Sequence, residues 1–364
     1  MPSFYQNDLF RALMATGQID LQVIFARSLA PQRRELCWTE DLTGFEYRFL
    51  NERSAILDAI PLIRVQRERL HVVNGIWAEP AFAVGLTELM MLGSRYAIYS
   101  EAPQHRLGRS PVKDRFKRGF GSYAVRKAAG LLPVSRLGED FFRDLGASSE
   151  AIYPFGYFRA APRVSATGAT GRSSIDLIFV GQLVHRKGLD ILLDALEPLW
   201  SQQPQLSLSV VGSGQEADAL RRRVEASGIA DRVRFEGALA AQHIPQRIAQ
   251  ADALILPSRW DGWGLVANEA LSVGVPVLIS DRCGAADLVE TGVNGWIFRS
   301  QDSGDLRRCL QALIACRPKW QRLRSAALIT GASISAETVA PYLIACLECM
   351  SGLRTQRTVA PWLQ

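Results

Sequence analysis

Short apolar runs alternate with segments of helical periodicity along almost the whole chain, and the alternation is clearest in its second half. Runs rich in Val, Ile, Leu and Phe predict strands at residues 175–181, 206–212, 233–237, 253–257, 276–280 and 295–298. Apolar residues three and four positions apart predict helices near 188–200, 215–227, 244–250, 265–272, 284–289 and 303–315. Six strand–helix units in a row predict a complete α/β domain of the Rossmann-like type with a parallel sheet.

The first half repeats this alternation less regularly. Predicted strands cover residues 21–26, 45–50, 69–75, 96–100 and 130–135, and predicted helices cover 6–16, 52–60, 79–92, 111–128 and 137–145. A Rossmann-like half normally opens on a strand, whereas here a helical segment follows Met1 almost at once. Either this domain lacks its opening strand or the recorded start lies downstream of the real one.

A segment with the composition of a linker separates the two halves of the chain. Residues 159–173 are rich in Ala, Gly, Ser and Thr and contain almost no bulky apolar residue. A chain of 364 residues suits two domains of roughly 150–200 residues each. We therefore predict a first domain over 1–158, a linker over 159–173, a second domain over 174–334 and a C-terminal helical segment over 335–364.

Composition narrows the class of protein. Hydrophobic residues make up 48% of the chain and charged residues 21%, which is typical of a globular protein. No run approaches the roughly 18 apolar residues of a membrane span, and the start lacks the pattern of a secretory signal. Six scattered cysteines indicate reduced thiols, and no metal site is expected. We therefore expect a cytoplasmic protein, and its net charge of +6 favours anionic partners.

The positive charge is concentrated in residues 110–127. Phe116, Phe120 and Tyr123 fall on one face of the predicted helix, with Lys and Arg around them. One interpretation is a patch that docks on an anionic membrane surface. The other is an ordinary amphipathic helix whose aromatic side chains lie in the core. No nucleic-acid-binding module is present elsewhere, so no nucleic-acid partner is expected.

Three turns after strands of the second half could bind anions. The turn after the first strand contains Gly181, Gln182, Arg186 and Lys187 just before a predicted helix. Two cations at a helix N-terminus suit a phosphate, because exposed amides and the helix dipole add to their charge. A solvated basic turn is the alternative.

The second turn matches the dinucleotide fingerprint. Gly212, Gly214 and Ala217 satisfy the G-x-G-x-x-A spacing, and Glu236 ends the next strand about 20 residues on. This pattern supports a nicotinamide-dependent oxidoreductase as an alternative function. A tight turn between a strand and a helix uses the same glycines.

The third turn is DGWGLVANE, from Asp261 to Glu269. We expect its helix to begin near Gly264, so that amides of the first turn face a diphosphate. The residues of this expected anion site are Gly262, Trp263, Gly264, Leu265 and Val266. Asp261 and Glu269 lie eight positions apart on either side of it, where each can accept a sugar hydroxyl. Taken singly, Asp261 could be a helix cap and Glu269 a surface residue.

At this point the sequence resembles a family. The turn FVGQLVHRKG, the segments VVGSGQE, VRFEGAL and ADALILPSRWDGWGLVANEAL, and the stretch GAADLVETGVNGWIF occur in the order shown by glycosyltransferase family 4. The resemblance covers about residues 174–313. It implies the GT-B fold, with two Rossmann-like domains facing across a cleft and a C-terminal helix that crosses back to the first domain.

The resemblance also implies roles for individual residues. Lys187 and Arg186 would hold the diphosphate of a nucleotide sugar, helped by the amides of Leu265 and Val266. Glu269 would hold the ribose hydroxyls, and Asp261 would contact the donor sugar. The remaining donor-site residues are Gly181, Gln182, Gly212 and Gly214 in the tight turns, and Gly237, Ala238 and Leu239 beside the base.

Two positions depart from the family pattern. Gln182 stands where many members have Arg, and Glu101 stands near the place of a first-domain His, where it could take the polar role. We expect a metal-independent, cofactor-free, retaining glycosyltransferase that uses a UDP- or GDP-sugar and a glycan or lipid-linked acceptor. The expected setting is surface polysaccharide or lipopolysaccharide biosynthesis, on the inner face of the membrane. A catalytically silent nucleotide-sugar-binding protein is a further alternative, next to the oxidoreductase.

Overall fold

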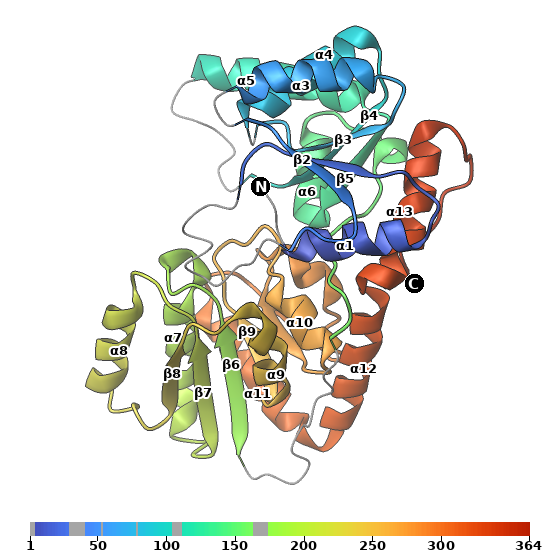
Figure 1. Cartoon of the computed structure of the whole chain (residues 1–364). Helices are drawn as coiled ribbons and strands as arrows, with labels where there is room; N and C mark the ends of the chain where they lie inside the picture. Colours follow the sequence, from blue (N-terminus) through green and yellow to red (C-terminus); the bar gives the residue numbers. More distant parts are fainter. Residues whose placement is uncertain (1–3, 29–40, 52–53, 78, 104–110, 163–173) are drawn as a thin grey trace. The chain divides into compact units, whose positions relative to one another are not determined.

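The computed structural model describes residues 4–28, 41–51, 54–77, 79–103, 111–162 and 174–364 (Figure 1). The described residues form two compact units, of which unit 1 comprises 4–158 and 336–364 and unit 2 comprises 159–335. The predicted linker residues 163–173 and the start of the basic segment at Ser110 lie outside the described residues.

Unit 2 is a doubly wound domain around one parallel sheet. Its strands are β6 (Ile175–Val180), β7 (Leu206–Val211), β8 (Val233–Gly237), β9 (Ala253–Leu256), β10 (Val277–Ser280) and β11 (Gly295–Phe298). They are hydrogen-bonded in the order β11-β10-β9-β6-β7-β8. The order reverses between β6 and β9, which is where doubly wound domains bind ligands at the carboxyl edge of the sheet.

Helices connect these strands. They are α7 (Leu189–Trp200), α8 (Ala217–Ala226), α9 (Ile244–Ala249), α10 (Val266–Ser272), α11 (Ser303–Ala315) and α12 (Trp320–Ser333). Short 3-10 turns are η2 (His185–Lys187), η3 (Ala241–His243), η4 (Gly284–Leu288) and η5 (Arg317–Lys319). The predicted helix over 284–289 is thus a 3-10 turn, and α12 was not predicted.

Helix α12 escaped prediction because its buried face contains a single large apolar residue. Its buried residues are Leu323, Ala327 and Gly331, whereas Ile329 is 72% exposed. A Cβ at Gly331 would lie 2.5 Å from the Cα of Ser272, at the end of α10. This glycine therefore lets α12 pack closely against α10.

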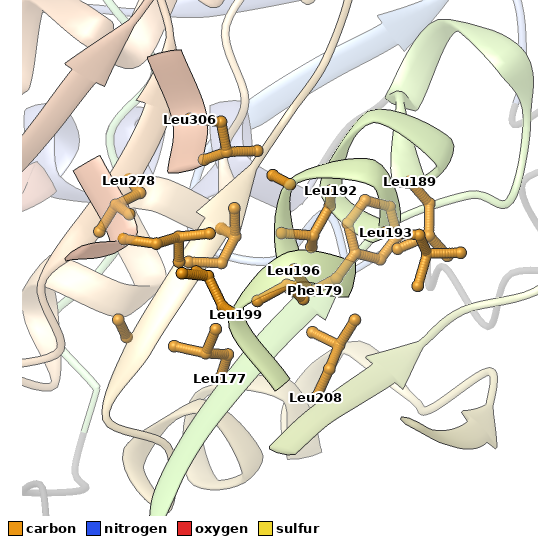
Figure 2. Packing of buried hydrophobic residues seen from close by; sticks show 14 of the residues in the cluster. Leu177, Phe179, Leu189, Leu192, Leu193, Leu196, Leu199, Leu208, Leu278 and Leu306 are labelled. Carbon is orange, nitrogen blue, oxygen red and sulfur yellow. The ribbon is translucent and has the colours of Figure 1, made fainter. Parts of the chain in front are cut away.

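The core of unit 2 lies between the sheet and the helix α7 (Figure 2). Leu177 and Phe179 of β6 and Leu208 of β7 are at most 1% exposed. The helix contributes Leu189, Leu192, Leu193, Leu196 and Leu199 to the same cluster. Each fully buried Leu or Phe side chain contributes about 1.5–3 kcal/mol. This packing holds the carboxyl end of β6, and the turn that follows it, against a rigid layer.

Unit 1 contains two smaller parallel sheets. One pairs β1 (Gln22–Phe25) with β2 (Glu46–Phe49), and the other has the order β3 (His71–Asn74), β4 (Tyr96–Glu101) and β5 (Gly130–Val134). Its helices are α1 (Phe4–Ala15), α3 (Ala55–Val65), α4 (Pro80–Leu92), α5 (Pro111–Lys127), α6 (Ser135–Asp144) and α13 (Ala336–Ser351), with short turns η1 (Ser149–Ala151) and η6 (Pro361–Leu363). The helix predicted over 52–60 actually runs to Val65, because Pro61 is accommodated inside it.

The C-terminal segment returns to unit 1, as predicted. Helix α13 packs against α1, and the Tyr342 hydroxyl donates to the carbonyl of Pro154 at 2.8 Å. The rings of Trp362 and Phe158 have centroids 4.9 Å apart. The chain thus passes between the units at Phe158–Arg159 and again at Ser335–Ala336.

Candidate functional site

Two cations and a carboxylate meet at the carboxyl edge of the unit 2 sheet. Lys187, in the turn after β6, donates from Nζ to Oδ2 of Asp261, in the loop after β9. Arg186 places Nη1 3.6 Å from the other carboxylate oxygen and donates to the carbonyl of Trp260 at 2.9 Å. The structure therefore brings Asp261 against Arg186 and Lys187, which the sequence placed together on a different turn.

The basic turn is fixed to the loop beside it. Gly188 has φ +70°, and a Cβ there would lie 2.1 Å from the carbonyl oxygen of Pro257. The backbone N–H of Arg259 donates to the carbonyl of Arg186 at 2.8 Å. The Arg259 guanidinium donates to both carboxylate oxygens of Asp190, at 2.9 and 2.6 Å. Burial opposes ionisation of Asp190, but the Arg259 guanidinium outweighs it and lowers the pKa of that carboxyl.

Glu269 lies in the first turn of α10, and its side chain is only 10% exposed. Glu269 is therefore not a surface residue of the helix, which was the alternative interpretation of this position. The guanidinium of Arg159 donates from Nη1 to its Oε1 at 3.0 Å. Burial raises the pKa of Glu269 to about 7, and the charge of Arg159 opposes this rise.

Helix α10 begins at Val266, two residues later than the sequence predicted. The reason is Gly264, which has φ +94° and is not helical. Leu265 is the N-cap residue, so the Leu265 and Val266 amides still lie at the N-terminal end of the helix.

The loop before α10 is held from inside by Trp263. This residue is 3% exposed, and its indole N–H donates to the side chain of buried Asn268 at 2.7 Å. Its carbonyl accepts from the amide of Ala285 at 2.7 Å, and the Asp261 carbonyl accepts from Gly284 at 3.1 Å. The ring of Trp263 thus supports the loop, while the neighbouring Gly262 is half-buried.

The glycines of the dinucleotide-like turn are explained by packing between two turns. Gly212 has φ +144°, and a Cβ there would lie 1.8 Å from the carbonyl oxygen of Gly181. A Cβ at Gly214 would lie 2.4 Å from the carbonyl oxygen of Leu183. The acidic residue of the fingerprint, Glu236, accepts from two nitrogens of the Arg247 guanidinium, Nε and Nη2, at 2.7 and 2.6 Å. This geometry argues against the nicotinamide alternative.

The remaining predicted donor-site residues lie on the same edge. The amide of Gly212 donates to the carbonyl of Gly237 at 2.7 Å, which joins the ends of β7 and β8. Ala238, which follows, is exposed, and Leu239 is half-buried. Gln182 is exposed beside the basic turn.

Glu101 belongs to unit 1, where it ends β4 beside Val134 of β5. Its Oε1 accepts a hydrogen bond from the Tyr157 hydroxyl at 2.5 Å. The tyrosine orients a carboxylate at the carboxyl edge of this sheet, and no sequence signal pointed to it.

Helix α5 exposes most of its predicted aromatic face. Phe116 is 75% exposed and Tyr123 is 56% exposed, whereas Phe120 packs on Trp77 with ring centroids 5.2 Å apart. Small side chains of α5, such as the fully buried Ala124, contact the core of unit 1 instead. The interpretation that placed all three aromatic side chains in the core is therefore wrong for Phe116 and Tyr123.

Comparison with solved structures identifies the fold class. The lipopolysaccharide outer core galactosyltransferase WaaB, in its apo form, aligns with a TM-score of 0.74 and 16% identity over 97% of both chains. HepE of Anabaena, solved in complex with UDP, aligns with a TM-score of 0.72 and 19% identity over 94% of this chain and 96% of that one. The fold is that of the GT-B glycosyltransferases.

Sequence comparisons address the second domain. Residues 169–328 match the family described as glycosyl transferases group 1. Alpha-D-kanosaminyltransferase of Streptomyces kanamyceticus is 24% identical over 53% of this chain and 54% of its own length. D-inositol 3-phosphate glycosyltransferase of Nocardia farcinica is 32% identical over 49% of this chain and 40% of its own length. The chain thus spans about half the length of these curated relatives.

The described residues contain neither a helix that could span a membrane nor a cluster of metal-ligand side chains. No helix in that part of the chain combines the length and the hydrophobicity of a membrane span. Within the same ranges, no three His, Cys, Asp or Glu side chains are grouped as metal ligands would be.

Proposed function

We propose that this protein is a retaining glycosyltransferase that moves a sugar from a UDP- or GDP-sugar to a glycan or a lipid-linked acceptor. The observation that carries the proposal is the convergence of Arg186 and Lys187 on Asp261, eight positions before the buried carboxylate of Glu269. These residues lie within the region that matches the glycosyl transferases group 1.

The chemistry follows from the leaving group. Breaking the anomeric C–O bond puts negative charge on a nucleoside diphosphate and positive charge on the sugar. Lys187 and Arg186 would stabilise the diphosphate, together with the amides of Leu265 and Val266. One preorganised donor of this kind is worth on the order of 3 kcal/mol. Because these groups can balance the charge, the proposed reaction needs no metal and no other cofactor.

The other donor-site residues would fix the substrate. Glu269 would accept hydrogen bonds from the ribose hydroxyls, and the backbone of Gly237, Ala238 and Leu239 would meet the base. Asp261 would contact the donor sugar on the side of the leaving group. Retention would follow from attack on the same face, with the leaving phosphate accepting the proton of the acceptor hydroxyl.

The names of relatives and structural neighbours support the substrate classes. HepE was solved with UDP-glucose, and a mannosyltransferase of Mycolicibacterium smegmatis is named as GDP-mannose-dependent. The neighbour WaaB is named as a lipopolysaccharide galactosyltransferase. We therefore propose a role in surface polysaccharide or lipopolysaccharide assembly, at the cytoplasmic face of the membrane. The exposed Phe116 and Tyr123 on the basic helix α5 would meet the anionic lipid surface.

A screen of donors tests the proposal. UDP- and GDP-sugars are incubated with candidate acceptors, and nucleoside diphosphate release and radiolabelled product are measured. Lys187→Ala and Glu269→Ala are each expected to lower turnover at least about tenfold, which is roughly 1.4 kcal/mol. Normal turnover in both variants would exclude this site. Nucleotide binding without any product would favour the silent binding protein, and binding of NADH alone would favour the oxidoreductase.

A further inference from the structure

Arg159 and Glu269 lie 110 positions apart and form an ion pair inside unit 2. The Arg159 side chain is 26% exposed and that of Glu269 is 10% exposed, so most of the pair is shielded from water. A buried carboxylate is costly unless a cation or hydrogen-bond donors compensate it. The charge on Glu269 therefore depends on this contact.

The backbone of Arg159 is itself fixed. Arg159 forms a parallel bridge with Ser335, and the two are the first and last residues of the main segment of unit 2. Ser335 is 7% exposed, which anchors the bridge in packed structure. The guanidinium thus extends from a held position rather than from a surface loop, and little conformational entropy opposes the contact.

The other charged groups on the elements around Glu269 either pair with other residues or, in the case of Arg322 of α12, are exposed. Helix α10 packs against α9, α12 and the strands β9 and β10. Arg247 of α9 pairs with Glu236, and Arg324 of α12 pairs with Asp252. The strands β9 and β10 contain no charged residue. In the described part of the chain, Arg159 is thus the cation that pairs with Glu269.

We propose that Arg159 is a positioning residue for the donor site, which favours the ionised form of Glu269 and holds its carboxylate in place to accept the ribose hydroxyls. The inference rests on the proposed role of Glu269 in nucleotide-sugar binding. The contact engages Oε1, and an ionised carboxylate offers two acceptor oxygens to the arginine and the ribose together. A protonated carboxyl loses acceptor capacity and binds the ribose less well.

Removal of the guanidinium has a specific consequence. Without Arg159, burial alone acts on Glu269, so its carboxyl takes up a proton at higher pH than in the wild type. Nucleotide affinity should then fall at neutral pH and recover as the pH rises. A purely structural role for Arg159 would lower affinity by the same factor at every pH.

The experiment is calorimetric titration with UDP and with GDP between pH 6 and pH 9. Arg159→Met removes the charge and keeps the length, and Arg159→Gln removes the charge but keeps a donor. Both are expected to bind at least about tenfold more weakly at pH 7 and to approach the wild type at pH 9. Arg159→Lys, which keeps the charge, should stay within about threefold of the wild type.

A double variant shows whether Arg159 acts through Glu269. In a Glu269→Gln background, Arg159→Met should cause no further loss, because the two effects are not additive when one residue acts through the other. Additive losses, or an unchanged pH profile in Arg159→Met and Arg159→Gln, would overturn the inference while leaving the proposed function intact. Failure of the wild type to bind UDP or GDP would instead reject the proposed function, and the inference with it.

Discussion

Lys187 and Asp261 form an ion pair between the turn that follows β6 and the loop that follows β9. Their side chains are 15% and 13% exposed, so the contact is largely screened from solvent. Arg186 adds a second cation 3.6 Å from the same carboxylate. In the proposed function, an incoming diphosphate would compete with Asp261 for Lys187, because both anions would use the same ammonium group.

This competition gives opposite predictions for binding and turnover. Asp261→Asn removes the competing charge, so UDP or GDP should bind several-fold more tightly, by roughly 1 kcal/mol. Turnover with a complete nucleotide sugar should fall at least about tenfold, since the proposed contact to the donor sugar loses its charge. Calorimetry with UDP and GDP measures the first effect, and nucleoside diphosphate release measures the second.

A surface carboxylate of the same unit serves as the control. Asp194 is 52% exposed and pairs with Arg223 on the outside of the domain. Asp194→Asn changes the net charge by the same amount and should alter neither affinity nor turnover. Weaker nucleotide binding in Asp261→Asn would mean that Asp261 orients Lys187 rather than competing for it.

Glu269 should make stability depend on pH. Its pKa in the folded state is about 7, against an ordinary value of 4.5, so between these values the folded state binds more protons than the unfolded state. Stability therefore falls as pH rises through this window, by up to about 3 kcal/mol. Glu269→Gln should remove this contribution, and urea unfolding of both proteins at pH 5 and pH 8 measures it.

The test compares how the free energy of unfolding changes with pH in the wild type and in Glu269→Gln. The wild type should lose more stability than Glu269→Gln on going from pH 5 to pH 8. Parallel losses in the two proteins would show that Glu269 titrates near its ordinary value, and that the Arg159 pair outweighs its burial.

The strands and their turns could be predicted from sequence because the signals are local. The unit 2 strands are mainly runs of apolar residues, and Arg186, Lys187 and Asp261 each lie in the turn or loop that follows such a run. In a parallel sheet these turns share one edge, so the topology alone brings the side chains together. That reasoning needs no knowledge of the packing between helices.

The rest of the site depends on contacts that no local pattern encodes. Arg159 reaches Glu269 across 110 positions from a segment whose composition indicates a linker. Trp263 donates a buried hydrogen bond to Asn268, although Trp263 was expected in the anion site and no role was expected for Asn268. Helix α12 packs through small residues and exposes Ile329, which obscures its periodicity.

The exposed aromatic side chains of α5 predict membrane binding. Phe116 and Tyr123 lie on a helix with Arg126 and Lys127 in its last turn, so insertion of the rings and attraction to anionic lipid act together. The double variant Phe116→Ala/Tyr123→Ala should bind vesicles that contain phosphatidylserine at least about tenfold more weakly, because it loses buried apolar area. Co-sedimentation with vesicles measures the effect.

Two controls distinguish specific lipid binding by α5 from nonspecific adsorption to vesicles. Ile329 is also strongly exposed, but it lies on α12, away from the basic helix in sequence. Ile329→Ala should not change vesicle binding, and vesicles of phosphatidylcholine alone should bind the wild type weakly. Equal binding of the wild type and the double variant would show that α5 does not contact lipid.

Gly212 should be indispensable for packing rather than for binding a dinucleotide. Gly212→Ala would place a Cβ 1.8 Å from the Gly181 carbonyl oxygen at φ +144°, so the turns after β6 and β7 must separate. We expect a loss of at least about 3 kcal/mol in the free energy of unfolding, measured with urea. Gly228 is the matched control, because it has φ +66° but open space around it, and Gly228→Ala should cost only about 1 kcal/mol. Equal losses in the two variants would mean that backbone strain alone, and not the close approach of the two turns, selects glycine at this position.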